Sequence, residues 1–245
     1  MTSSSRPLPP SRRDRRKQET ISDIRAVALR QLADAGPTGI SIRAIARDLD
    51  MTASAVHYYF PGRQALVDAL TTDGFASLAA ALRSAYEQAG ALTPTERWMA
   101  VARAHRAWAR QRPAEYVLIY GHTGGAAQRV NQQAAPAMGE VVSVLFAVMR
   151  DCVRHGDIDV SRIETATSSS LRAQFAAWRA ADGLDDLPDG ALAACMLCYA
   201  RLHGAIILEL IGHVPAELAD RGALFDLQMR HTVEALYPPD RAPLP

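Results

Sequence analysis

Apolar residues recur at spacings of three and four along most of the chain, which predicts amphipathic helices rather than strands. The first helix is expected from about residue 13 to residue 35, because apolar side chains from Ile21 to Leu32 fall on one stripe. Gly36 and Pro37 should end it, since Gly favours a helix C-cap and Pro cannot continue the helix. Because no segment has a convincing strand period, the predicted fold class is all-α.

Three more helices are predicted before residue 90. Ser41 and Thr52 are good N-caps, and they should begin two short helices that end near residues 49 and 59. Asp50 lies in the tight turn between these two helices. Pro61 and Gly62 interrupt the pattern again, and a long helix should follow from residue 63 to about residue 88.

The rest of the chain continues the helical pattern. Thr93 and Ser161 each stand three residues before a Glu, so each should open a helix with a capping box. Residues 121–133, rich in Gly, Gln and Asn, are expected to form a loop, and residues 183–190 a linker. The helices expected in this part span about residues 94–111, 113–120, 135–155, 161–181, 190–212 and 217–236.

Composition places the chain among globular proteins, with 49% hydrophobic and 22% charged residues. The N-terminus has no apolar segment typical of a secretory signal, and no run approaches the roughly 20 apolar residues of a membrane helix. The chain has three cysteines, and an odd number argues against a disulfide framework. These features favour a cytoplasmic protein without a membrane partner.

Positive charge is concentrated at the N-terminus, where residues 1–17 contain six basic side chains and one acidic side chain. Such an end can face a polyanion, or it can form a solvated tail, and charge alone leaves both interpretations open. The first 11 residues are rich in Ser and Pro, so we expect them to be a disordered basic arm.

The first three predicted helices have the layout of a helix-turn-helix unit, in which the third helix enters the major groove of DNA. Ala53 can touch a thymine methyl group, and Ser54 can donate or accept a hydrogen bond at a base edge. Ser41, Arg43 and Thr52 are placed to hold phosphates, partly through helix N-termini. The alternative is a three-helix core without a role in DNA binding. The candidate DNA-binding residues are Ser41, Arg43, Thr52, Ala53, Ser54, His57, Tyr58, Tyr59 and Arg63.

Two motifs in this segment carry a family resemblance. They are Ser41-Ile-Arg-Ala-Ile-Ala-Arg and Thr52-Ala-Ser-Ala-Val-His-Tyr-Tyr-Phe-Pro-Gly-Arg-Gln-Ala-Leu. Together they resemble the DNA-binding domain of TetR-family transcriptional regulators, in register over about residues 15–70. The resemblance implies nine or ten helices in total, with the helix-turn-helix domain followed by a C-terminal helical bundle.

The chain departs from the family pattern at three positions within these motifs and the turn between them. Asp50 stands where the family usually has Gly, and Asp tolerates the left-handed conformation that the turn needs. His57 replaces the usual Tyr at the end of the recognition helix, and Arg63 keeps the charge of the usual Lys. By the same resemblance, Tyr59 is a phosphate contact.

The second part of the chain resembles one C-terminal class of the family. Residues 104–116 are similar to its helix, Arg-Pro, helix segment, and residues 202–210 to its penultimate long helix with a His-Gly motif. The resemblance implies that the middle helices enclose a small apolar or amphipathic effector, although the aromatic candidates can equally be ordinary core residues. The candidate ligand-binding residues are Trp98, His105, Trp108, Tyr116, Tyr120, Met149, Phe175 and Trp178.

The family also implies a homodimer, in which the last two long helices of each subunit build a four-helix interface. The apolar stripes on these helices could supply that interface or could simply complete the core of the subunit. The candidate interface residues are Leu192, Tyr199, Ile206, Leu210, Phe225, Met229 and Leu236.

The sequence shows no catalytic set, metal site or cofactor motif. Cys195 and Cys198 form a CxxC inside a helical stretch without a second pair, which favours buried core thiols. His203, His213 and His231 lack ligand spacing, and no Gly-rich phosphate loop or nucleophile motif is present. We therefore expect no enzyme activity.

The resulting prediction is a ligand-responsive, sequence-specific transcriptional regulator, a repressor released from a pseudo-palindromic double-stranded DNA operator by its effector. One alternative is an all-helical small-molecule carrier or enzyme with an incidental basic N-terminus, and another is a DNA-binding protein without an effector. The expected organisation is an arm (1–11), a helix-turn-helix domain (12–62), a connecting helix (63–90), an effector-binding and dimerisation domain (91–237) and a tail (238–245).

Overall fold

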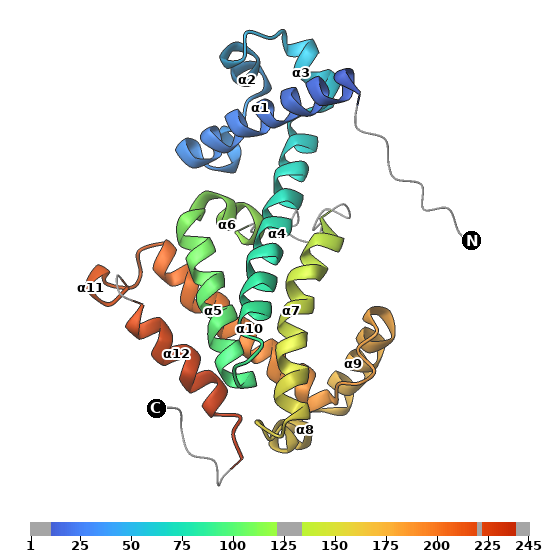
Figure 1. The fold of residues 1–245 in the computed structure, drawn as a ribbon, viewed down its shortest axis with the longest axis vertical. Coiled ribbons are helices and arrows are strands. Elements are labelled where there is room, and N and C mark those ends of the chain that lie inside the picture. Colours follow the sequence, from blue (N-terminus) through green and yellow to red (C-terminus); the bar gives the residue numbers. More distant parts are fainter. Residues whose placement is uncertain (1–10, 122–133, 220–221, 239–245) are drawn as a thin grey trace. The chain divides into compact units, whose positions relative to one another are not determined.

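The computed structural model describes residues 11–121, 134–219 and 222–238, which form twelve α-helices and one 3-10 helix and contain no strand (Figure 1). The all-α prediction is confirmed, and the helix count is slightly above the expected nine or ten. The predicted arm up to residue 10, the loop at 122–133 and the tail from residue 239 lie outside the described residues. The elements are α1 (Arg12–Ala35), η1 (Pro37–Gly39), α2 (Ile42–Asp48), α3 (Ala53–Tyr59), α4 (Arg63–Gln88), α5 (Pro94–Gln111), α6 (Pro113–Tyr120), α7 (Ala135–Arg154), α8 (Ser161–Ala166), α9 (Ser169–Asp182), α10 (Asp189–Leu210), α11 (Ala216–Ala219) and α12 (Ala223–Glu234).

The helix predicted at residues 161–181 is two helices, α8 and α9. Ser168 begins α9, because its hydroxyl accepts a hydrogen bond from the backbone N–H of Leu171 at 3.3 Å. The capping box predicted from Ser161 is absent, because Ser161 is the first residue of α8 and its backbone N–H donates to the Asp159 carboxylate at 2.9 Å. The Glu164 carboxylate instead accepts a hydrogen bond from the backbone N–H of Gly190 on α10. A partner distant in sequence has thus replaced the local one.

The helix predicted at residues 217–236 is also divided, into α11 and α12. Gly222 immediately precedes α12 with a φ of 72°, in the left-handed region that glycine adopts without steric cost. The earlier predicted starts, ends and Gly or Pro breaks, from α1 through α7, agree with the structure to within about two residues.

The chain folds into two compact units. Unit 1 comprises residues 1–74 and 114–134, and unit 2 comprises residues 75–113 and 135–245. Helix α4 is continuous from Arg63 to Gln88, so its first half belongs to unit 1 and its second half to unit 2.

The core of unit 1 is built by α1, α2, α3, the first half of α4, and α6. Helix α3 has only seven residues, a length that is marginal for a helix on its own in water. It is held by Val56, which is fully buried, and by Phe60 at its end. Burying such a side chain contributes about 1.5–3 kcal/mol, so these two residues fix the position of α3. The buried members of this core are Ile24, Val27, Ala28, Leu32, Ile40, Ile42, Ile45, Ala46, Val56, Phe60, Leu66, Val67, Leu70 and Leu118.

Unit 2 is organised around α10, which packs against α5, α7, α8, α9 and α12 (Figure 1). A largely buried ion pair ties α5 to α10, with 2.8 Å between Nε of Arg106 and a carboxylate oxygen of Glu209. A second cluster joins the end of α4 to α5 and α7. There the Asp151 carboxylate accepts hydrogen bonds from the Tyr86 hydroxyl at 2.7 Å and from Arg97 at 2.6 Å.

Helices α4 and α10 are long and apolar enough, by length and composition alone, to cross a membrane. The expectation that no segment comes near this limit was therefore wrong. Core helices of water-soluble proteins pass the same test. Helix α10 has that character, because Leu192, Leu202 and Ile206 are buried among its neighbours in unit 2.

Candidate functional site

The turn between α2 and α3 is closed by Asp50 in the left-handed conformation, with a φ of 52°. Among the residues that the structure describes, Asp50 is the only non-glycine residue with a positive φ. The turn is held by the backbone N–H of Met51, which donates to the carbonyl of Ala46 at 2.8 Å. The prediction that Asp can replace the usual Gly at this position is confirmed.

Both predicted N-caps of the helix-turn-helix are in place. The Ser41 hydroxyl accepts a hydrogen bond from the backbone N–H of Ala44 at 3.4 Å, and the Thr52 hydroxyl accepts one from Ala55 at 3.1 Å. The hydroxyls of Thr52 and Ser54 are 3.0 Å apart and hydrogen-bonded to each other. The start of α3 therefore presents two adjacent hydroxyl groups to solvent, which can donate to phosphates or base edges.

The nine candidate DNA-binding residues all lie in unit 1 and divide into two groups by exposure. Ser41, Ala53 and Tyr59 are partly buried, and Ala53 and Tyr59 pack against the core. Tyr58, by contrast, is 71% exposed. The outward surface of α3 thus consists of hydroxyl, imidazole and phenol groups, while Ala53 and Tyr59 also stabilise the helix that carries them. The exposed group consists of Arg43, Thr52, Ser54, His57, Tyr58 and Arg63.

Two arginines change the set of cations that is available to contact phosphates. Arg63 donates a hydrogen bond to the backbone carbonyl of Pro37, so this cation already has a structural role. Arg47, which was not predicted, is exposed on α2 four residues after Arg43. Residues four apart share a face of a helix, so the spacing of these two arginines could have identified the pair from sequence.

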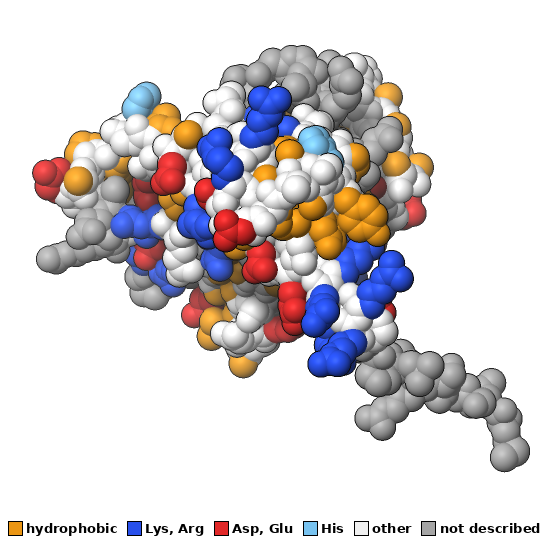
Figure 2. All heavy atoms as spheres, turned by 90° about the horizontal axis from the view of Figure 1, so that it is seen from above, with side chains coloured by type: hydrophobic (Ala, Val, Ile, Leu, Met, Phe, Trp, Pro, Cys, Tyr) orange, Lys and Arg blue, Asp and Glu red, His pale blue; other side chains and the backbone are white. Residues whose placement is uncertain are grey.

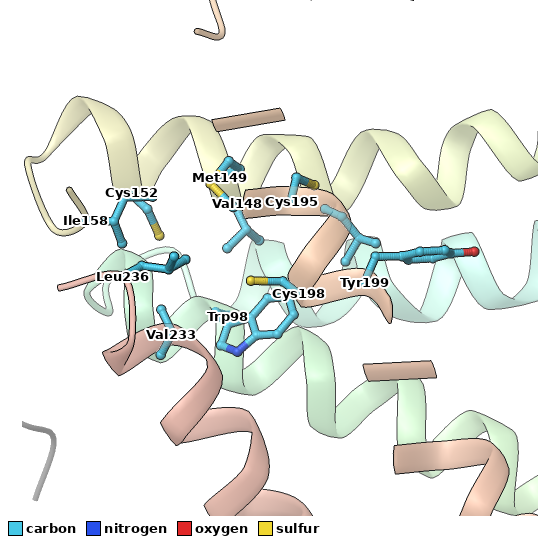
Figure 3. Close-up of a pocket in the computed structure, with 11 residues that line it drawn as sticks. Trp98, Val148, Met149, Cys152, Ile158, Cys195, Cys198, Tyr199, Val233 and Leu236 are labelled. Carbon is cyan, nitrogen blue, oxygen red and sulfur yellow. The ribbon is translucent and has the colours of Figure 1, made fainter. Parts of the chain in front are cut away.

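Unit 2 contains a small, partly open cavity between α5, α7, α10 and α12 (Figure 3). Its volume is about 20 Å³, enough for a single water molecule. Two predicted ligand-binding residues, Trp98 and Met149, line it, and the indole N–H of Trp98 donates to the carbonyl of Met229 at 3.3 Å. The wall is apolar and rich in sulfur, and the hydroxyl of Tyr199 points away from the other labelled side chains (Figure 3). The lining residues are Trp98, Leu145, Val148, Met149, Cys152, Ile158, Cys195, Cys198, Tyr199, Val233 and Leu236.

The other predicted ligand-binding residues do not line this cavity. Tyr116 and Tyr120 belong to unit 1 and pack against each other with ring centroids 5.0 Å apart. Trp108 is buried in unit 2, where its indole N–H donates to the Ser77 hydroxyl at 3.1 Å.

Phe175 and Trp178 lie on α9, where Trp178 packs on Phe146 at 5.4 Å. His105 is fully buried on α5, with its ring 5.2 Å from that of His203. The eight residues are therefore spread over several packing sites of both units.

The candidate dimer-interface residues are mostly buried within their own chain. Leu192, Ile206, Phe225 and Met229 are at most 1% exposed, and a side chain without exposed surface cannot touch a second copy. Tyr199 and Leu236 line the cavity of unit 2, and Leu210 is partly buried. The exposed apolar side chains near the same helices are a different set, namely Met196, Leu197, Leu208, Ile211 and Leu227.

Burial sets the protonation of the thiols and imidazoles in unit 2. It lowers the pKa of His105 well below its usual value and that of His203 to about 4, so both rings are neutral at neutral pH. It also raises the pKa of the Cys195 thiol, and that of Cys198 to about 12. The thiols therefore stay protonated, which agrees with the prediction of buried core cysteines. Across the described ranges, no group of three or more His, Cys, Asp or Glu residues could hold a metal ion.

Two family models match the chain. The model described as bacterial regulatory proteins, tetR family, matches residues 24–70, which include α2, the turn and α3. The model described as tetracyclin repressor-like, C-terminal domain, matches residues 98–232. The N-terminal and the C-terminal parts of the predicted family resemblance are therefore each matched by a model of the family. These matches do not test the His-Gly motif itself.

Relatives and solved structures agree with the family models. The HTH-type transcriptional regulators Rv1816 of Mycobacterium tuberculosis (strain ATCC 25618 / H37Rv) and Mb1846 of Mycobacterium bovis are each 33% identical over 226 residues, covering 92% of this chain and 95% of theirs. The structure of SCO4313, described as a regulatory protein, has a TM-score of 0.72 and 27% identity, covering 91% of this chain and all of its own. A protein of unknown function from Rhodococcus sp. RHA1 shares the fold, with a TM-score of 0.65 at 24% identity, over 89% of this chain and 95% of its own.

Proposed function

The chain belongs to the TetR family of DNA-binding transcriptional regulators, and we propose that it is a homodimeric repressor of a pseudo-palindromic operator, released by a small, mostly apolar effector. The observation that carries this proposal is the intact helix-turn-helix of unit 1. Its turn is closed by Asp50, and its third helix exposes Ser54, His57 and Tyr58. A regulator of this kind acts in the cytoplasm and needs no catalytic residue.

Exposed residues of the helix-turn-helix divide by role in this proposal. Thr52 and Arg43 contact phosphates, because a capping hydroxyl and an arginine at helix ends suit phosphate oxygens. Ser54 and His57 face base edges and set sequence preference. The half-sites of the two subunits lie about one helical turn of DNA apart, as in other dimeric helix-turn-helix proteins.

The dimer interface is proposed on the exposed apolar face of α10 and α12. Leu197 and Leu208 on α10 are 53% and 42% exposed, and Leu227 on α12 is 62% exposed. Large apolar side chains exposed together on adjacent helices favour burial against a second copy. This face replaces the buried stripe that sequence periodicity selected.

The effector is proposed to bind in the small cavity of unit 2 and to enlarge it. Its walls hold apolar and sulfur-containing side chains, so a suitable ligand is small, neutral and mostly apolar. Helix α4 contributes residues to both units, and a shift of this helix would couple ligand binding to the DNA-binding unit. The effector must bind the state that does not bind DNA more tightly, typically by about 1–3 kcal/mol.

The DNA-binding proposal is tested by selecting bound duplexes from a random library and measuring their affinity against salt concentration. We expect a two-fold-symmetric site and a steep salt dependence. Thr52→Ala should weaken binding to every sequence, whereas Ser54→Ala should relax the choice of sequence with a smaller loss of affinity. Unchanged affinity of Thr52→Ala would refute the proposed docking, and failure to enrich any sequence would refute the function.

The effector proposal is tested by a thermal-shift screen of small, neutral, apolar molecules, because a ligand that binds only the folded state raises the melting temperature. Val148→Ile adds one methyl group to the cavity wall and should abolish the shift. Val144→Ile is the matched control, since Val144 is buried on the same helix without lining the cavity. Equal shifts in both variants would place the effector elsewhere, and no shift in the wild type would favour a DNA-binding protein without an effector.

A further inference from the structure

Unit 1 has a second surface feature beside the helix-turn-helix face, a groove between the start of α1 and the end of α3. Its volume is about 740 Å³. One wall is the first turns of α1, and the other is formed by Tyr58 and Tyr59 on α3. Lys and Arg side chains gather beside a hydrophobic patch on the face seen in Figure 2. The groove is lined by Arg12, Arg13, Asp14, Arg16, Lys17, Thr20, Tyr58 and Tyr59.

Four cations and one carboxylate line the groove, so its net charge is strongly positive. Arg12, Arg13, Arg16 and Lys17 are exposed, and none of them forms an ion pair in residues 11–121, 134–219 or 222–238. The one carboxylate, Asp14, accepts hydrogen bonds from the Ser11 hydroxyl at 2.7 Å and from the Ser11 backbone N–H at 3.2 Å. These hydrogen bonds lower the pKa of Asp14, so it acts as the capping anion of α1.

The cations are arranged along one side of α1. Positions 12 and 16, and likewise 13 and 17, are four residues apart and therefore share a helix face. From residue 12 to residue 17 the helix rises by about 7.5 Å, since each residue adds about 1.5 Å. Successive phosphates of one DNA strand are about 3.4 Å apart along the duplex axis, so the row spans about two phosphate steps.

The aromatic wall connects this groove to the surface of α3. The Tyr58 ring lies edge-on to the Tyr59 ring at 5.2 Å, and 71% of Tyr58 is exposed. A phenol hydroxyl can donate to a phosphate oxygen, and the ring can cover a sugar. Because His57 precedes Tyr58 on the same exposed stretch of α3, an occupant of the groove lies next to whatever α3 contacts.

We propose that this groove binds the sugar–phosphate backbone of duplex DNA that flanks the bases contacted by α3. The inference rests on the proposed DNA binding and extends it, because it adds Arg12, Arg13, Arg16 and Lys17 as backbone contacts outside the helix-turn-helix. Each subunit then covers more DNA than its half-site bases require. A duplex trimmed to the half-sites loses these contacts while it keeps those of α3.

The test compares Arg16→Ala with Arg15→Ala. Both changes remove one positive charge from the same turn of α1, but Arg16 lines the groove and Arg15 does not. Ala is the best helix former, so both variants should keep α1 folded, which circular dichroism checks. The dissociation constant is measured against salt for the selected operator, once with long flanks and once trimmed to the half-sites.

On the long duplex, Arg16→Ala should reduce the slope of log affinity against log salt by about 0.9 for each subunit, and Arg15→Ala should reduce it less. If the variant and the wild type have equal affinity at 1 M salt, this change of slope makes the binding of the variant about five-fold weaker per subunit at 0.15 M salt. On the trimmed duplex, Arg16→Ala and the wild type should bind alike.

Four results would overturn or separate the proposals. Equal slopes for Arg16→Ala and Arg15→Ala on the long duplex would refute the groove as a backbone site. An equal loss for Arg16→Ala on both duplexes would also refute it, because the contact would not be to flanking DNA. If the wild type bound neither duplex, the proposed function itself would fail, whereas equal wild-type binding to both duplexes would refute the groove alone.

Discussion

The left-handed residue at the α2–α3 turn gives a direct test of how the recognition helix is held. Asp50 has a φ of 52°, and the N–H of the next residue closes the turn on the carbonyl of Ala46 at 2.8 Å. The left-handed conformation costs roughly 1–2 kcal/mol for most L-residues and less for Asp, whose short polar side chain can hydrogen-bond locally. Asp50→Ala should therefore destabilise unit 1 by about 1 kcal/mol.

Asp50→Gly separates this steric cost from the loss of the carboxylate. Glycine adopts the left-handed region freely but loses about 0.5–1 kcal/mol of conformational entropy on folding, so the two effects nearly cancel. We expect the stability of Asp50→Gly to lie within about 0.5 kcal/mol of the wild type. Asp50→Val should be the least stable variant, because a β-branched residue is an outlier at positive φ.

The assay is thermal unfolding of the three variants, followed by operator affinity at a temperature where all remain folded. A loss of 1 kcal/mol lowers the melting temperature of a domain of 60–100 residues by about 4–8 °C. The expected order is Gly close to Asp, then Ala, then Val, with DNA affinity falling in the same order as the turn loosens. The reasoning would be refuted if Asp50→Ala were as stable as Asp50→Gly.

Three further predictions concern unit 2. The buried thiols of Cys195 and Cys198 have raised pKa values, so a thiol reagent should label them only as fast as the protein unfolds, and rapid labelling of the native protein would contradict this. The pKa of His203 is about 4 when folded and about 6.5 when unfolded, so unfolding takes up a proton and stability falls as pH drops from about 6.5 to 4. His203→Gln should shrink the difference in melting temperature between pH 7.5 and pH 5, and an unchanged difference would exclude this contribution. Leu227→Asp should convert the dimer to monomer in size-exclusion chromatography with light scattering, whereas Leu171→Asp on exposed α9 should not, and equal masses for both variants would rule out the α10–α12 face.

Local sequence determined most of the helix-turn-helix. Ser41 and Thr52 were identified as caps because a side-chain oxygen needs only a backbone N–H three residues later, and both contacts are present. The turn at Asp50 also follows from a local property, the tolerance of Asp for positive φ. These features act within a few residues, so the sequence alone contains them.

Where a local hydrogen bond competed with a partner distant in sequence, tertiary contacts decided which of the two formed. The capping box at Ser161 failed because the Glu164 carboxylate binds the Gly190 amide instead. The groove beside α3 could not be predicted from the sequence, because its walls also come from distant segments. Arg16 and Tyr58 lie 42 positions apart in sequence and line the same groove only after folding.

The two apolar faces of α10 show the same division between sequence and structure. Periodicity identified the stripe that includes Leu192 and Ile206, which is the buried one, while Leu197 and Leu208 remain exposed on another side. A helix with apolar residues on more than one side gives no strong single stripe, so periodicity cannot assign one face to the core and another to a partner. Sequence therefore determined the helices, their caps and the DNA-binding motif. Only the packing of α5, α7 and α12 around α10 decided which side chains are buried, because burial depends on neighbours that are distant along the chain.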